Sequence, residues 1–157
     1  MSGSTARPDE ASSGARVSRL SPLIRSGLRT LSAALLLTAC GTPVPDVPSG
    51  QTVSYSTHLE PLVIARCLGC HEVDEPEAEL VLERGRGYQA LVGPSSVQAP
   101  SVALVEPGEP ENSYLWLKLQ HTAPHGKGMP RTLTGSKKLR DDELELYRRW
   151  IEDGAQP

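Results

Sequence analysis

The clearest hydrophobic pattern lies near the C-terminal end of the chain. Leu144, Tyr147 and Ile151 recur at helical spacing, with charged residues between them. This spacing places the three side chains on one face of a helix. Acidic residues precede this stripe, arginines lie near its end and Gly154 follows it, as is typical of helix ends. The pattern predicts a helix over about residues 141–153 that buries one face.

Two further helices are expected from the apolar positions. Thr57 and Glu60 have the spacing of a capping box just before the apolar run 62–65, which predicts a helix there. Pro110 suits the first turn of another helix, because its missing N–H costs little at that position. Residues 114–119 of this second helix are apolar on most sides, which indicates deep burial.

Glycine and proline interrupt the pattern elsewhere. Residues 72–110 contain two short apolar clusters, at 80–82 and 88–92. The second could form a short helix, and the rest of this segment is interpreted as loop. Residues 121–139 are rich in Gly, Thr and Pro and are interpreted as a long loop. The expected fold class is therefore all-α: a small helical domain whose long loops wrap around a cofactor.

Composition supports a cofactor in the core. The chain has no Phe and an aromatic content of 4%. A domain of roughly a hundred residues with so few large side chains has difficulty in filling its own core. The formal net charge is −3, which gives no support to nucleic-acid binding.

The N-terminal region has the features of an export signal. Residues 1–39 carry five arginines against two acidic residues and end in the apolar run Leu31–Ala39, which is too short to span a bilayer. Cys40 follows at the position of a lipid-modified cysteine. The expected organisation is a signal peptide over 1–39, a Pro-rich tether over 40–52 and a folded domain over 53–157.

The run Cys67-Leu68-Gly69-Cys70-His71 is typical of covalent attachment of a c-type haem. Two thiols three residues apart on a helical turn lie on one side and can bond both vinyl groups of one porphyrin. The next residue, His71, is then held under the iron as a ligand. A thioredoxin-like pair would need a βαβ pattern, and a zinc site would need a second pair of ligands. The motif therefore predicts one covalent haem c and its iron.

The sixth ligand of the iron is expected to be Met129, which lies in a loop stiffened by neighbouring Gly and Pro. A methionine that only fills space is more usual on a core helix. His121 and His125 in the same loop, and His58 near the first helix, are the alternative ligands. An open sixth position is the remaining alternative.

Taken together, these residues resemble the class I monohaem cytochrome c family. The resemblance covers about residues 53–157 and includes the Cys67–His71 motif, the Met129-Pro130 pair and the Trp-Ile and Gly-Ala close of the last helix. It implies that the last helix packs across the first. Residues 105–115 are similar to a segment of cytochrome-like domains in large bacterial surface and periplasmic proteins.

The N-terminal region resembles that of bacterial lipoproteins. Residues 37–40 are similar to their lipobox, and Gly41 in the next position favours the outer membrane. The resemblance implies a protein that is tethered to a membrane through lipidated Cys40, on the periplasmic side.

The expected function is single-electron transfer by a carrier that is not itself an enzyme. A haem with both axial positions filled has no site for substrate but exchanges electrons with little rearrangement. The alternatives are a haem-bearing subunit of a larger redox complex, or a five-coordinate haem peroxidase or sensor. Redox partner proteins are expected to dock on a basic stretch that flanks Met129. Its cations are Lys127, Arg131, Lys137, Lys138 and Arg140.

Overall fold

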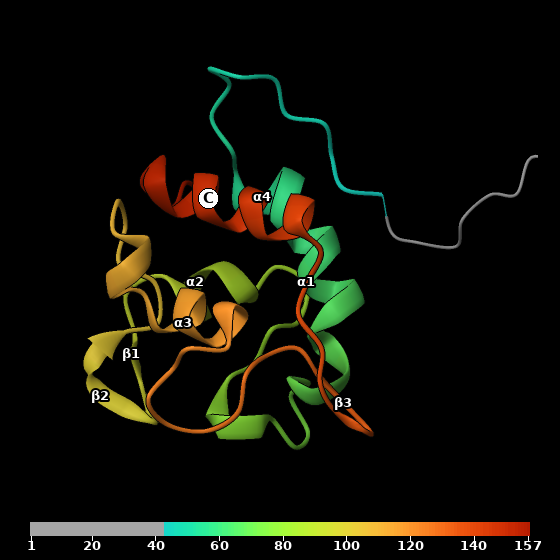
Figure 1. Ribbon diagram of the computed structural model, residues 1–157, viewed down its shortest axis with the longest axis vertical. Helices are drawn as coiled ribbons and strands as arrows, with labels where there is room; N and C mark the ends of the chain where they lie inside the picture. Colours follow the sequence, from blue (N-terminus) through green and yellow to red (C-terminus); the bar gives the residue numbers. More distant parts are fainter. Residues whose placement is uncertain (1–42) are drawn as a thin grey trace, which may run out of the picture. The chain divides into compact units, whose positions relative to one another are not determined.

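The computed structural model describes residues 43–157, which lie in one compact unit (Figure 1). The predicted signal peptide, the lipobox and Cys40 lie outside the described residues. Within the described part of the chain, no helix is long and apolar enough to cross a membrane.

Helices form where the hydrophobic pattern predicts them. A π-helical turn, η1 (Tyr55–Leu59), leads into α1 (Glu60–Arg66), which has a proline in its first turn. The long predicted helix near the C-terminus is α4 (Asp141–Glu152). The other helical elements are shorter: η2 (Leu68–Cys70), η3 (Glu77–Glu79), α2 (Gly87–Leu91), η4 (Pro110–Asn112) and α3 (Tyr114–Gln120).

Two small antiparallel sheets show that the all-α expectation is wrong. β1 (Ser95–Ser96) pairs with β2 (Ala99–Ala103), and β3 (Arg131–Thr132) pairs with β4 (Gly135–Ser136). Both hairpins lie in segments expected to be loops, where their paired strands satisfy backbone N–H and C=O groups that no helix takes up. Three of these strands have two residues each, too few for a periodic hydrophobic pattern, and β2 shows no alternation of buried and exposed positions. The fold is a mixture of helices and small hairpins.

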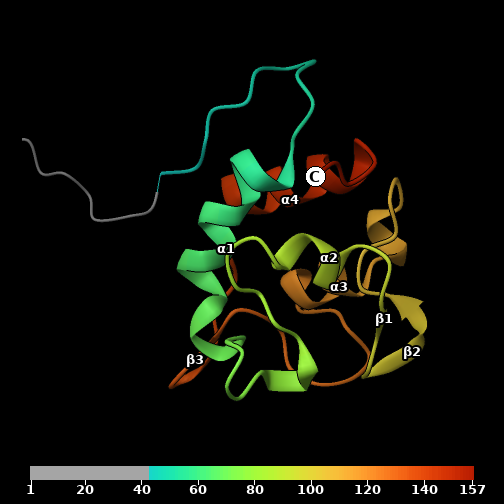
Figure 2. The same ribbon diagram turned by 180° about the vertical axis from the view of Figure 1, so that it is seen from behind.

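The helix near the C-terminus packs against the start of the domain. In Figures 1 and 2, α4 lies across the beginning of the α1 segment, and the Tyr55 N–H donates to the Gln156 carbonyl at 2.9 Å. The core here is aromatic. The Tyr55 ring centroid lies 5.6 Å from that of Trp150 and 5.9 Å from that of Tyr88, and Trp150 is fully buried.

The end of the predicted tether packs on the folded domain. Val47 is buried, and the Arg149 guanidinium donates to the carbonyls of Val47, Pro48 and Gln51 at 2.8, 3.2 and 3.1 Å. Val44 also packs against the core, so this end of the predicted tether is part of the folded unit. The division of the chain into signal, tether and domain stays a prediction.

Candidate functional site

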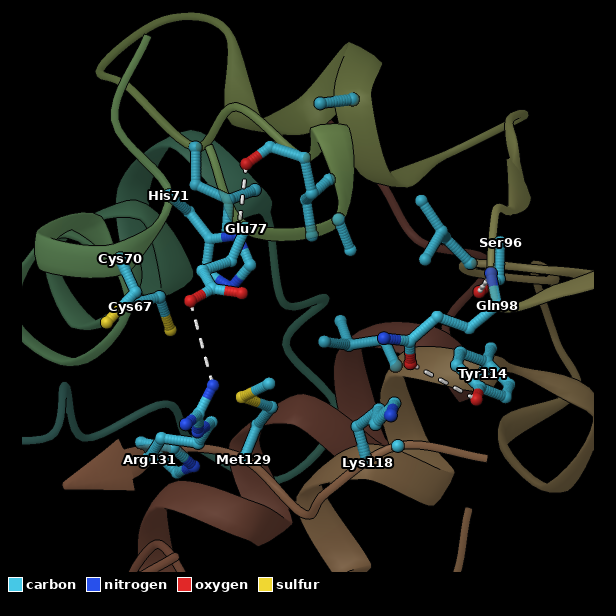
Figure 3. Close-up of a pocket in the computed structure, with 18 of the residues that line it drawn as sticks. Cys67, Cys70, His71, Glu77, Ser96, Gln98, Tyr114, Lys118, Met129 and Arg131 are labelled. Carbon is cyan, nitrogen blue, oxygen red and sulfur yellow. Dashed lines mark hydrogen bonds and ion pairs between the residues drawn. The ribbon is translucent and has the colours of Figure 1, made fainter. Parts of the chain in front are cut away.

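A cavity of about 870 Å³ opens between α1, the β1–β2 hairpin, α3 and the loop before β3 (Figure 3). Its volume lies within the range of roughly 300–1,000 Å³ that is usual for small-molecule and cofactor sites. Cys67, Cys70, His71 and Met129 all line it, although Met129 is far from the other three in sequence. The fold thus brings every residue predicted to hold a haem to one cavity.

The end of α1 presents both thiols. The Cys67 N–H donates to the Val63 carbonyl at 2.8 Å and closes the helix, and the turn η2 then carries the chain to Cys70. Both cysteines are free thiols, and Figure 3 shows them on the same wall of the cavity. Burial raises the pKa of the Cys67 thiol to about 11, although a hydrogen bond with Tyr147 acts in the opposite direction and lowers this pKa. The haem-free thiol is therefore protonated at neutral pH.

His71 is oriented for metal binding. The side chain is 8% exposed, and its Nδ1 lies 3.0 Å from the Leu80 carbonyl oxygen, to which it donates in the matching tautomer. The Leu82 N–H in turn donates to the His71 carbonyl at 2.8 Å. A histidine ligand usually donates its second ring N–H to a carbonyl or carboxylate in this way. The arrangement leaves Nε2 as the ligand atom.

Met129 reaches the cavity from a loop that is held at two points. Its N–H donates to the Lys118 carbonyl at 2.9 Å, and its carbonyl oxygen lies 3.1 Å from Nε2 of His121. Gly128 is needed beside it, because a Cβ there would collide with the His121 ring. In Figure 3 the thioether points into the cavity from the wall opposite His71.

None of the three alternative histidines lines the cavity. The ring of His121 bonds to the Met129 backbone. Nδ1 of His58 accepts the Ser54 N–H at 2.9 Å, and His125 is exposed. The zinc alternative gains no support either, since residues 43–157 contain no group of three or more His, Cys, Asp or Glu side chains arranged to hold a metal ion.

Sequence reasoning missed the polar groups of the cavity wall. Glu77 and Arg131 both line the cavity and form an ion pair at 3.6 Å, which joins the segment after the Cys67–His71 motif to the loop of Met129 (Figure 3). Lys118, Tyr114 and Gln98 line the wall that faces them. The lysine in the otherwise apolar run 114–119 was the one sequence signal for this wall.

The basic stretch is exposed, but its members differ in their partners. Arg131 pairs with Glu77, and Arg140 pairs with Asp142 at 3.0 Å. Lys137 and Lys138 flank the β3–β4 hairpin and form no ion pair within residues 43–157. Lys127 is likewise exposed and forms no ion pair within these residues, so the three lysines are the members most available to an external partner.

Comparison with known proteins gives one family match and similarity to one enzyme. The profile of a family described as Planctomycete cytochrome C matches residues 67–131. Hydrazine synthase subunit alpha of Kuenenia stuttgartiensis is 30% identical over 125 residues, an alignment that covers 68% of this chain and 16% of that protein. A solved structure of hydrazine synthase from Kuenenia stuttgartiensis aligns with a TM-score of 0.48 at 23% identity, over 67% of this chain and 16% of that one.

These matches correct one expectation and support another. The chain spans a small part of the length of the enzyme subunit that it matches. Similarity to a subunit of an enzyme contradicts the expectation of an electron carrier outside any enzyme. The family match covers the Cys67–His71 motif and Met129 and implies that the chain binds haem c. The comparisons therefore support a cytochrome c-like family for this chain.

Proposed function

We propose that this chain is the haem c-bearing part of a redox enzyme complex and that one haem in the described cavity passes single electrons within it. The convergence of Cys67, Cys70, His71 and Met129 on one cavity carries this proposal. The similarity to an enzyme subunit supports the placement in a complex.

Each of the four side chains has a distinct role in the proposal. The thiols of Cys67 and Cys70 fix the cofactor to the end of α1. His71 offers Nε2 to the iron while the Leu80 carbonyl holds the ring in place. Met129 offers a thioether, which raises the reduction potential relative to a second imidazole. The haem itself supplies a reversible one-electron couple.

Replacing Met129 with alanine tests the sixth ligand. We expect a low-spin spectrum in the wild-type holoprotein, with the weak red band of a thioether-ligated ferric haem. Met129→Ala should lose that band, become high-spin and show a lower reduction potential, because the thioether ligand favours ferrous iron. Absorption spectra in both oxidation states measure the band and the spin state, and a redox titration followed by absorbance measures the reduction potential.

The exposed His125 provides the matched control. His125→Ala should leave the spectrum unchanged, because that side chain does not line the cavity. An unchanged spectrum of Met129→Ala would refute the thioether ligand. A high-spin spectrum of the wild type would instead indicate an open position and redirect the proposal to peroxidase or sensor chemistry.

We also propose that the mature chain is tethered at the periplasmic face of a membrane through lipidated Cys40. The lipobox resemblance supports this. Metabolic labelling with a radioactive fatty acid should mark the wild type, whereas Cys40→Ser should be unlabelled and should leave the membrane fraction. Equal labelling of both proteins would refute lipidation at Cys40.

Docking of an acidic redox partner on the basic stretch is the remaining proposal. The double variant Lys137→Glu and Lys138→Glu should slow electron transfer with an acidic partner protein roughly tenfold at low ionic strength. The effect should fade above physiological salt, because exposed charges are then screened. Stopped-flow kinetics over a salt series measure it.

A control with the same change in net charge separates docking from bulk electrostatics. Arg86→Glu with Arg148→Glu places that change just before α2 and on α4, at side chains 62% and 46% exposed. If this control slows the reaction as much as the lysine variant does, the basic stretch is no docking surface.

A further inference from the structure

One wall of the cavity is built around a buried ammonium group. Lys118, on α3, is 7% exposed, and its Nζ donates to the carbonyls of His125 at 2.6 Å and Lys127 at 3.3 Å. The ammonium also lies 5.1 Å from the centre of the Tyr114 ring. Figure 3 shows Lys118, Tyr114 and Gln98 on the side of the cavity away from Cys67 and Cys70.

This charge has no counter-ion in the described part of the chain. No carboxylate of residues 43–157 forms an ion pair with Lys118. Backbone carbonyls satisfy some of its hydrogen bonds but carry no net charge. Burial of an unpaired ammonium is costly, and here it lowers the pKa of Lys118. A cation retained in a cavity wall at this cost indicates that the ligand of the cavity is anionic at that end.

The other cations of the cavity wall are already paired or exposed. Arg66 binds Glu143 at 2.7 Å, and Arg131 pairs with Glu77. Lys127 is exposed to solvent. Lys118 is therefore the buried cation of this wall that an anionic ligand can neutralise.

We propose that Lys118, with Tyr114 and Gln98 beside it, forms the binding site for the carboxylate groups of the haem. The inference rests on the proposed haem function. It specifies in addition which edge of the haem faces Lys118. A haem joined to Cys67 and Cys70 through its vinyl groups carries its two propionates on the opposite edge of the macrocycle. Lys118 lies at the corresponding end of the cavity, whereas the charged side chains nearer the cysteines, Glu77 and Arg131, already pair with each other.

The hydroxyl and amide near Lys118 complete the site. The Tyr114 hydroxyl donates to the His125 carbonyl at 2.8 Å and lies 3.5 Å from Oε1 of Gln98. The Gln98 amide nitrogen has further donor capacity for a carboxylate oxygen. The Lys118 backbone carbonyl also accepts the Met129 N–H. The last turn of α3 thus holds both the carboxylate site and the loop of the distal ligand.

Reduction potentials of the haem-loaded protein test this assignment. Lys118→Met should retain covalent haem but favour the ferric state, because removal of the cation leaves the carboxylate charge uncompensated. We expect the ratio of oxidised to reduced haem at the wild-type midpoint to rise roughly tenfold, a shift of about 59 mV. Lys118→Arg should restore most of the wild-type potential. Arg148→Met, which removes an exposed cation on α4 outside the cavity wall, should leave the potential unchanged.

Infrared spectra provide a readout that a merely structural lysine would not move. With ¹³C in the haem carboxylates, Lys118→Met should shift their absorption toward that of hydrated carboxylate. A potential and carboxylate bands that match those of the wild type would overturn the assignment. If Lys118→Met yields no haem-loaded protein, the labelled wild type decides, since a single hydrated carboxylate band there also overturns it. A wild type without covalent haem would instead refute the proposed function itself.

Discussion

Replacing both Cys67 and Cys70 with alanine should abolish covalent haem and unfold much of the domain at room temperature. The cavity of about 870 Å³ lies against α1, α3 and the β1–β2 hairpin, so loss of its occupant removes packing from several elements at once. We expect the free energy of unfolding to fall on the order of 5 kcal/mol, comparable to the whole stability of a small domain. Haem staining of a denaturing gel and urea unfolding followed by circular dichroism measure the two effects.

A third cysteine gives the matched control for this variant. Cys40→Ser removes a thiol outside the described residues and should retain haem and stability. Each single variant, Cys67→Ala or Cys70→Ala, should keep one thioether and intermediate stability. Covalent haem in the double variant would show that the attachment site lies elsewhere.

Sequence patterns predicted the parts of the fold that repeat regularly. The stripe of Leu144, Tyr147 and Ile151 correctly predicted α4, whose observed bounds are Asp141–Glu152. The Cys67–His71 motif was equally informative, because the cofactor demands its spacing. Both signals are local, since the residues that carry them are close together in the chain.

The hairpins could not be predicted for a physical reason. β1 and β3 have two residues each, too few to show an alternation of apolar and polar positions. The segment 93–108 was therefore interpreted as loop. The hairpin also packs against α3, a contact between distant parts of the chain that no local pattern records.

Long-range contacts also decide the details of the candidate site. His121 was a candidate ligand, but its ring bonds to the backbone of Met129 and supports that loop. Lys118 belongs to a helix predicted to be deeply buried, and it is indeed 7% exposed. A charged residue inside an apolar run was a visible sign of a polar site, but the hydrophobic pattern alone did not identify that site.

The largest effect expected outside the haem attachment concerns Glu143, a buried carboxylate that joins α4 to α1. Glu143 is 1% exposed and accepts hydrogen bonds from Nη2 of Arg66 at 2.7 Å and from the Arg140 backbone N–H at 2.9 Å. Glu143→Ala removes the acceptor for both and leaves Arg66 beside the core without its partner. Removal of one member of a fully buried pair costs about 3–5 kcal/mol. Because 33% of the Arg66 side chain is exposed, we expect a smaller loss here, about 2–3 kcal/mol.

Urea unfolding of the haem-loaded protein measures this loss of stability. Two further variants on the same helix serve as a control and as a conservative substitution. Glu145→Ala, at a side chain 56% exposed, should change the free energy of unfolding by less than about 0.5 kcal/mol. Glu143→Gln should lose less than Glu143→Ala, because the amide oxygen still accepts one hydrogen bond. Arg66 directly precedes Cys67 and lines the cavity. Glu143→Ala should therefore also increase the mobility of the Cys67–His71 segment. A stability equal to that of Glu145→Ala would show that the Arg66–Glu143 pair does not hold α1 against α4.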